Sequence, residues 1–83
     1  MTKVQQAEQL IQMLLIEDPV ERLKALGLDS PSLEEKKVLE WAKVAQQQLR
    51  SVPSHPMFSK AWEVSAEIFR SLTLQCRIVK GKG

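Results

Sequence analysis

Metal-binding and reactive side chains are scarce in this 83-residue chain, which has one cysteine, Cys76, and one histidine, His55. A structural zinc site needs four cysteine or histidine ligands, and a catalytic zinc site usually needs three protein ligands. A single thiol also excludes an intrachain disulfide, and a small domain without disulfides is typical of a reducing compartment. We therefore expect neither a metal centre nor a disulfide framework.

Glycine and long hydrophobic runs are also in short supply. The three glycines, one internal and two at the end of the chain, exclude a phosphate-binding glycine-rich loop. Five of the first eight residues are polar and one of these is an acid, so no signal peptide is expected. The longest early apolar run, Met13–Ile16, is far shorter than the roughly 20 residues that span a bilayer. We expect a cytoplasmic protein with no membrane segment, no cofactor and no small-molecule substrate.

The length and the charge of the chain limit its organisation. With 83 residues it forms one domain at most, over 1–83. The overall net charge is +2, but residues 1–49 carry a net −2 and residues 50–83 carry a net +4. A basic C-terminal half is suited to nucleic acid, to an acidic partner, or to the acidic half of a second copy.

Apolar residues recur at spacings of three and four along the whole chain, which is typical of amphipathic helices. Turn residues divide the chain into four helical segments, over 3–16, over 19–26, from 31 or 33 to 49 or 50, and from 56 or 57 to 79. Thr2 with Gln5, and Asp18 with Pro19, predict helix starts, and Gly27 predicts a left-handed helix end. Ser30 or Ser32 is expected to cap the third helix. Residues 79–83 are predicted to be a flexible basic tail.

These segments predict an all-α fold, a small bundle of three to four helices built on a long antiparallel helical hairpin. The last two helices form this hairpin, because a connection of four to six residues favours antiparallel neighbours. Small residues permit their close approach (Ala42, Ala45, Ala61 and Ser65). The first two helices lie across the hairpin, and the last helix is long enough to need cover from them or from a second chain.

Three groups of residues could carry catalytic, metal-binding or redox chemistry, and each has a simpler structural interpretation. His55 follows Ser54, but adjacent residues between prolines do not form a catalytic triad, and His55 is expected to help cap the last helix. Glu63 and Glu67 share one helix face that we interpret as solvent-exposed. Cys76 lies in an apolar stripe, where a free cysteine behaves as a small hydrophobic residue. We therefore expect a protein that is not an enzyme.

The abundance of apolar surface favours a protein–protein interaction module, such as an adaptor, a chaperone-like subunit or an inhibitor, most simply a homodimer. Six residues are assigned to packing or to the shared interface (Leu10, Leu14, Phe58, Trp62, Phe69 and Leu72).

The alternative function is a small nucleic-acid-associated regulator. Four basic residues near the C-terminus would contact phosphates (Arg70, Arg77, Lys80 and Lys82). The segments over 19–26 and 33–49 would form a helix-turn-helix in this alternative, although Leu23 and Lys36 do not fit that motif.

Overall fold

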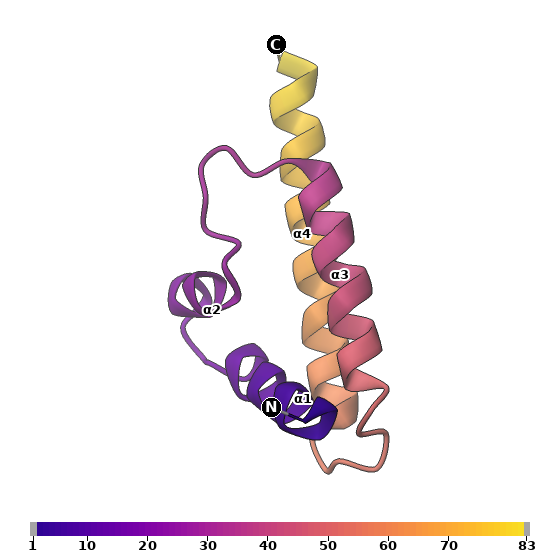
Figure 1. The fold of residues 1–83 in the computed structure, drawn as a ribbon. Coiled ribbons are helices and arrows are strands. Elements are labelled where there is room, and N and C mark those ends of the chain that lie inside the picture. Colours follow the sequence, from indigo (N-terminus) through magenta and orange to yellow (C-terminus); the bar gives the residue numbers. More distant parts are fainter. Residues whose placement is uncertain (1, 83) are drawn as a thin grey trace.

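The computed structural model describes the backbone of residues 2–82 and the side chains of residues 2–78. The described chain is all-helical, which confirms the predicted fold class (Figure 1). Its elements are α1 (Lys3–Leu14), α2 (Pro19–Leu26), α3 (Glu35–Leu49) and α4 (Phe58–Lys82).

The start of α1 is fixed by the predicted capping box. The Gln5 backbone N–H donates to Thr2 Oγ1 at 3.1 Å, and the Thr2 N–H donates to Gln5 Oε1 at 3.0 Å. The helix ends at Leu14, two residues before the predicted end at Ile16. The Arg22 side chain supports this earlier end, because its Nε donates to the Ile16 carbonyl at 2.8 Å.

Both ends of α2 follow local signals in the sequence, as predicted. Asp18 Oδ1 accepts the Val20 N–H at 2.9 Å, and Pro19 occupies the first turn. At the other end Gly27 has a φ of 74°, in the left-handed region. The Leu28 N–H donates to the Leu23 carbonyl at 2.9 Å and the Gly27 N–H donates to the Lys24 carbonyl at 3.1 Å, which are the two hydrogen bonds of a Schellman motif.

The serine caps predicted for α3 are wrong. The helix begins at Glu35, and its N-cap is Glu34, whose side chain accepts no capping hydrogen bond. Ser30 instead stabilises a turn around Pro31: its Oγ accepts the Ser32 N–H at 3.3 Å, and its carbonyl accepts the Leu33 N–H at 3.3 Å. Serine competes with helix formation by such local bonds, and here the turn keeps both serines out of the helix.

The longest element is α4, with 25 residues. His55 precedes α4 and helps to cap its N-terminus, as predicted. The His55 Nδ1 accepts the Met57 N–H at 3.0 Å, and the His55 carbonyl accepts the Phe58 N–H at 3.0 Å. Helical backbone continues through Lys82, three residues beyond the predicted end at Val79. The predicted flexibility of 79–83 stays a prediction, because the side chains of 79–82 and the whole of Gly83 lie outside the described residues.

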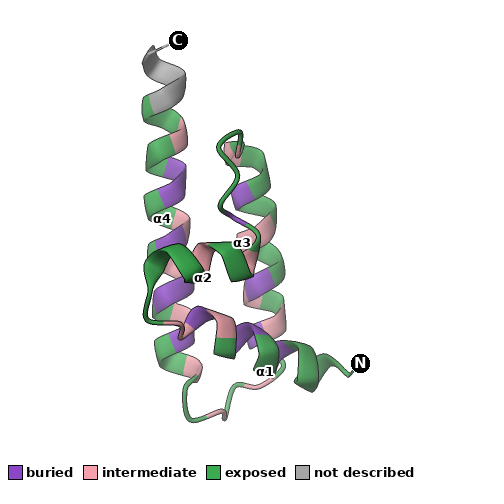
Figure 2. Cartoon of the chain, turned by 90° about the vertical axis from the view of Figure 1, so that its left-hand side faces the viewer, coloured by how far each residue is buried: buried purple, intermediate pink, exposed green. Residues whose placement is uncertain are grey.

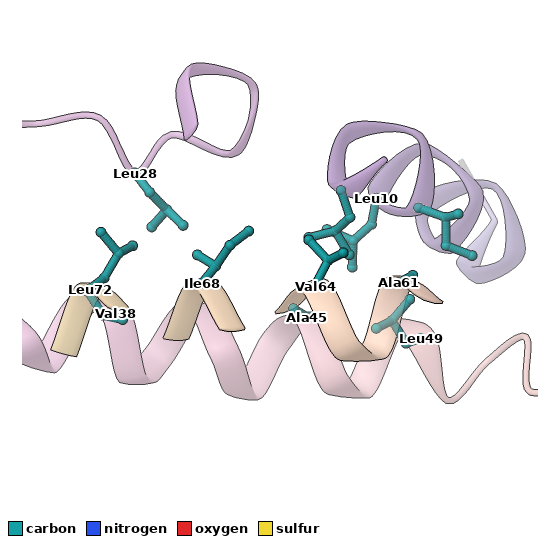
Figure 3. Packing of buried hydrophobic residues seen from close by; sticks show 11 residues of the cluster. Leu10, Leu28, Val38, Ala45, Leu49, Ala61, Val64, Ile68 and Leu72 are labelled. Carbon is teal, nitrogen blue, oxygen red and sulfur yellow. The ribbon is translucent and has the colours of Figure 1, made fainter. Parts of the chain in front are cut away.

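The helices α3 and α4 form the predicted antiparallel hairpin, and α1 lies across it and packs on both (Figures 1 and 2). The core lies where these three helices meet, and Figure 3 shows its side chains interdigitating between α1 and the hairpin. Its fully buried members come from α1, α3 and α4 (Ala7, Ile11, Leu14, Val38, Leu49 and Ala61).

The position of α2 excludes the helix-turn-helix. Within the described chain α2 packs directly on α1 and makes no close helix–helix contact with α3 or α4. It contributes no fully buried residue. The segment 27–34 then runs alongside the hairpin to its far end, where α3 begins (Figure 1). The result is an elongated molecule with extents of 43 × 23 × 22 Å.

Candidate interaction surface

A groove lies between α2, the segment 27–34 and the end of the hairpin farthest from α1. Its volume is about 1120 Å³. The apolar residues that line it come from every one of these elements (Val20, Leu23, Leu28, Leu33, Leu39, Phe69 and Leu72). We call this feature the linker groove.

The linker groove exists because the segment 27–34 is held at both ends of its path. At the first end Gly27 turns the chain, and Leu28, 5% exposed, inserts its side chain toward Ile68 and Leu72 of α4 (Figure 3). At the other end the Cys76 Sγ donates to the Leu33 carbonyl at 3.4 Å. An apolar residue directly after a left-handed glycine commonly makes such a contact.

One ion pair joins the beginning of α3 to the C-terminal part of α4. The Arg77 Nε donates to Glu35 Oε1 at 3.0 Å, and 72% of the Arg77 side chain remains exposed. Such an exposed pair contributes at most about 1 kcal/mol to stability. Asp29 and Glu34 are further acidic residues on the groove lining.

A second surface lies on the outer face of α4, on the side opposite α3. Two large apolar side chains are exposed there, Leu74 at 59% and Ile78 at 49%. A smaller hollow of about 250 Å³ adjoins this face and lies between α2 and α4, with Pro19, Arg22 and Ser71 in its lining. Apolar side chains and a hollow thus lie next to each other on one side of the molecule.

The six residues predicted for packing or an interface fall into two groups. Leu10, Leu14 and Leu72 are buried inside the single chain, so they serve its own core. The three aromatic residues are half-buried and pack against the edge of that core (Phe58, Trp62 and Phe69). Only Phe69 and Leu72 line the linker groove.

Phe58 and Trp62 lie together near the turn between α3 and α4, at the opposite end of the molecule from the groove. Their ring centroids are 5.6 Å apart with the planes tilted by 33°. The Arg50 guanidinium lies 5.9 Å from the centroid of the Trp62 ring, close enough for a cation–π interaction. The structure therefore does not bring the predicted interface residues into one patch.

Of the four basic residues of the nucleic-acid alternative, the structure describes the side chains of two, and acidic residues lie near both. Arg70 is exposed on the outer face of α4, where Glu63 and Glu67 are exposed as well. Arg77 is paired with Glu35. The side chains of Lys80 and Lys82 lie outside the described residues.

The potentially reactive side chains have structural roles in the fold. His55 accepts a backbone hydrogen bond through Nδ1, and Cys76 donates to a backbone carbonyl. The buried hydroxyls of Ser65 and Thr73 donate to carbonyls one turn earlier in α4, at 2.8 Å each. Among the described side chains no buried polar atom lacks a hydrogen-bond partner, and no three potential metal ligands gather.

Sequence reasoning expects a hydrophobic contact of Leu28 after the Gly27 cap, which the structure confirms, but it does not assign Leu33, Leu74 or Ile78 to an interaction surface. Leu28 and Leu33 are apolar residues in a turn-rich segment, and that mismatch is the signal that the segment packs against something. Leu74 and Ile78 lie four residues apart and off the main apolar stripe of their helix. Two apolar residues at this spacing form a small second stripe, which a single amphipathic face does not require.

No helix in the described part of the chain is both long enough and apolar enough to cross a membrane. Comparisons of the chain with protein-family models, with curated proteins and with solved structures found no match.

Proposed function

We propose that the chain is a non-enzymatic protein–protein interaction module that acts as a homodimer, in the class of adaptors, chaperone-like subunits and inhibitors. The observation that carries the proposal is the amount of surface that one copy leaves uncovered. The accessible surface is 5966 Å², whereas a folded monomer with this mass of 9.4 kDa exposes about 5000 Å². The excess is comparable with the roughly 800 Å² that each partner buries in a standard interface.

Exposed apolar side chains support the same conclusion. Among the side chains that the structure describes, seven large apolar ones are at least one-third exposed (Val4, Val20, Leu39, Val44, Met57, Leu74 and Ile78). Isolated exposed apolar residues are ordinary on a protein surface, but neighbouring ones mark interaction sites. Leu74 and Ile78 are one helical turn apart, and Val20 and Leu39 line one groove.

A cytoplasmic location is part of the proposal. The single thiol, Cys76, is half-buried and hydrogen-bonded to a backbone carbonyl of its own chain, so the fold uses it in reduced form. A reducing compartment maintains such a thiol.

Sedimentation equilibrium over roughly 1–100 µM tests the homodimer, a range that spans the micromolar affinities of weak interfaces. The proposal predicts that the average mass rises toward twice the chain mass of 9.4 kDa as concentration increases. A mass equal to one chain at tens of micromolar would contradict it.

Nucleic-acid association remains the alternative proposal. It is supported by the net charge of +4 on residues 50–83, and it is weakened by the pairing of Arg77 and by the acids beside Arg70. It predicts binding that falls steeply between low and physiological salt. A mobility-shift titration at low salt in which nothing shifts would eliminate it.

A further inference from the structure

We infer that residues 19–28, which comprise α2 and the turn after it, open and close over α4 as one unit, which we call the strap. Leu28 is the residue that keeps the strap closed. When the strap opens, α1, α3 and α4 stay packed on one another, while Ile68 and Leu72 of α4 become accessible. This motion belongs to a single copy of the chain, so it goes beyond the proposed function and does not depend on the homodimer.

Open space separates much of α2 from α4. Leu23, Leu72 and Gln75 line both the linker groove and the smaller hollow, so the two spaces meet between α2 and α4. Within α2, Val20 lines only the groove and Arg22 lines only the hollow, which places open space on either side of Leu23. The helix therefore bridges α4 instead of packing along it, and within the described chain the two helices make no close helix–helix contact.

One buried side chain fixes the strap to α4. Leu28, at 5% exposed, is the one buried residue of 19–28, a range that the structure describes throughout. Its side chain points toward Ile68 and Leu72, which are each 7% exposed (Figure 3). The apolar side chains of α2 are only half-buried or are exposed. Since stabilisation by apolar contact grows with the area that is buried, Leu28 contributes most to closure.

The hydrogen bonds of the strap are local. Arg22 donates from Nε to the Ile16 carbonyl at 2.8 Å and from Nη2 to the Glu17 carbonyl at 3.4 Å, which joins α2 to the turn that precedes it. The ion pair of α2 likewise lies within the helix. Among the described residues, no hydrogen bond or ion pair joins 19–28 to α3 or α4, so opening breaks none.

Short segments connect the strap to the rest of the chain on both sides. Residues 15–18 lead from α1, and residues 29–32 lead to the point where Cys76 donates to the Leu33 carbonyl. Residues 29–32 are all exposed, and the turn that Ser30 stabilises lies within them. Hinges are commonly a few residues at the ends of elements, where the chain takes up changes in φ and ψ. Both segments are placed to serve as hinges.

The caps of α2 make the strap one unit. Asp18 Oδ1 accepts the Val20 N–H, and the N–H groups of Gly27 and Leu28 donate to carbonyls of α2 itself. None of these bonds involves α3 or α4. The hydrogen bonds of the strap are therefore kept or lost together, as in a cooperative local opening.

Opening changes the surface of α4 and leaves the main core intact. The fully buried side chains of Ile11, Leu49 and Ala61 lie between α1, α3 and α4, and α1 packs directly on both helices of the hairpin. Displacement of the strap uncovers Ile68 and Leu72 and joins the groove and the hollow into one apolar cleft along α4. The strap thus controls how much apolar surface of α4 is accessible.

Native-state hydrogen exchange in a core variant tests whether the strap opens by itself. Leu49→Ala removes a fully buried side chain that stays packed when the strap opens. It should accelerate exchange around Ala45 by about thirtyfold or more. It should leave exchange of the amides of 23–26 within about twofold of the wild-type rate. Far-ultraviolet circular dichroism verifies that the variant keeps its helices, and Leu49→Val is the milder substitution if it does not.

A second pair of variants tests the role of Leu28. Leu28→Ala should accelerate exchange of the amides of 23–26 by about tenfold or more, because it removes most of the apolar contact that keeps the strap closed. Val20→Ala is the matched control within the strap, since Val20 is 58% exposed. It should change the same rates by less than about threefold.

Urea gives an independent readout of the size of the opening. The sensitivity of an unfolding reaction to urea increases with the surface that the reaction exposes. Opening of the strap exposes far less surface than unfolding of the whole chain. At low urea concentrations, exchange of the amides of 23–26 should therefore rise much less steeply with urea than exchange around Ala45.

Three results would overturn the inference. Equal acceleration by Leu49→Ala at 23–26 and around Ala45, or equal urea dependence at both places, would show that α2 opens only when the whole fold opens. An effect of Leu28→Ala no larger than that of Val20→Ala would show that Leu28 does not hold the strap closed. The homodimer is tested by mass alone, so either proposal can fail while the other stands.

Discussion

Gly27 is the residue on which the path of the linker depends, because it alone among the described residues has a positive φ, at 74°. A side chain with a Cβ is strained in this conformation, by roughly 1–2 kcal/mol. A Cβ added at Gly27 would meet no atom within 4 Å, so no steric clash adds to this backbone strain.

We therefore expect Gly27→Ala to lower the free energy of unfolding by about 1 kcal/mol. Urea denaturation followed by circular dichroism measures the loss. An unchanged midpoint would show that the left-handed turn is not needed, and a loss of more than about 3 kcal/mol would indicate a clash that the structure does not contain.

Leu14 matters through its side chain rather than its backbone conformation, since that side chain is 0% exposed in the core between α1 and the hairpin. Leu14→Ala should lower the free energy of unfolding by about 2–5 kcal/mol, because it removes buried methyl groups and leaves a cavity. A domain of this length has a total stability of only about 4–12 kcal/mol. Val44→Ala, at an exposed position, should change stability by less than about 0.5 kcal/mol, and equal effects of the two substitutions would contradict the assignment of the core.

The element most weakly attached to the fold is α2. It has eight residues, none of them fully buried, and its only helix neighbour in the described chain is α1. Its caps at Asp18 and Gly27 are well formed, and its packing on the core comes from the half-buried Leu23 and Leu26. Isolated helices of this length are marginal in water, and low burial is typical of segments that open locally.

Native-state hydrogen exchange should therefore show faster exchange for the amides of α2 than for the central amides of α3 and α4. The comparison uses residues 23–26 in α2, whose amides bond within the helix, and the buried region around Val38 and Ala45 in α3. Protection factors of similar size in both would mean that α2 is an integral part of the core.

The elements that the sequence predicts well are those fixed by local signals. The capping box at Thr2, the proline at Pro19 and the glycine at Gly27 each act within a few residues, and all three act as predicted. The serines before α3 were equally local candidates, but a turn around Pro31 uses them instead. Local rules identify candidates for capping, and competition between neighbouring turns decides which one forms.

The arrangement of elements and the candidate surfaces were harder to predict, because they depend on contacts far apart in the sequence. The Cys76 contact with Leu33 and the Arg77 pair with Glu35 each join residues more than 40 positions apart. No periodicity along one helix contains this information. The six residues predicted for packing or an interface were chosen from the apolar helix faces, and three of them, Leu10, Leu14 and Leu72, are buried in the core of the single chain.

The whole molecule is elongated, and its shape explains why one copy leaves so much surface uncovered. Its radius of gyration is 13.1 Å, whereas a compact domain of this length has about 12 Å. At about 1.5 Å per residue, the 25 residues of α4 are about 37 Å long, and the 15 residues of α3 are roughly 15 Å shorter. The helix α3 therefore cannot cover the whole length of α4. In the proposed homodimer, a second copy would cover part of this surface and bury apolar side chains that water otherwise contacts.

The central claim is that packed and exposed apolar helix faces, rather than a reactive site, are the working part of this protein. Small-angle scattering at tens of micromolar tests this claim most directly, because it reports mass and shape in one experiment. The claim predicts a mass of two chains and a radius of gyration well above the 13.1 Å of the single chain. A mass of one chain, with a radius of gyration close to that value, would contradict it.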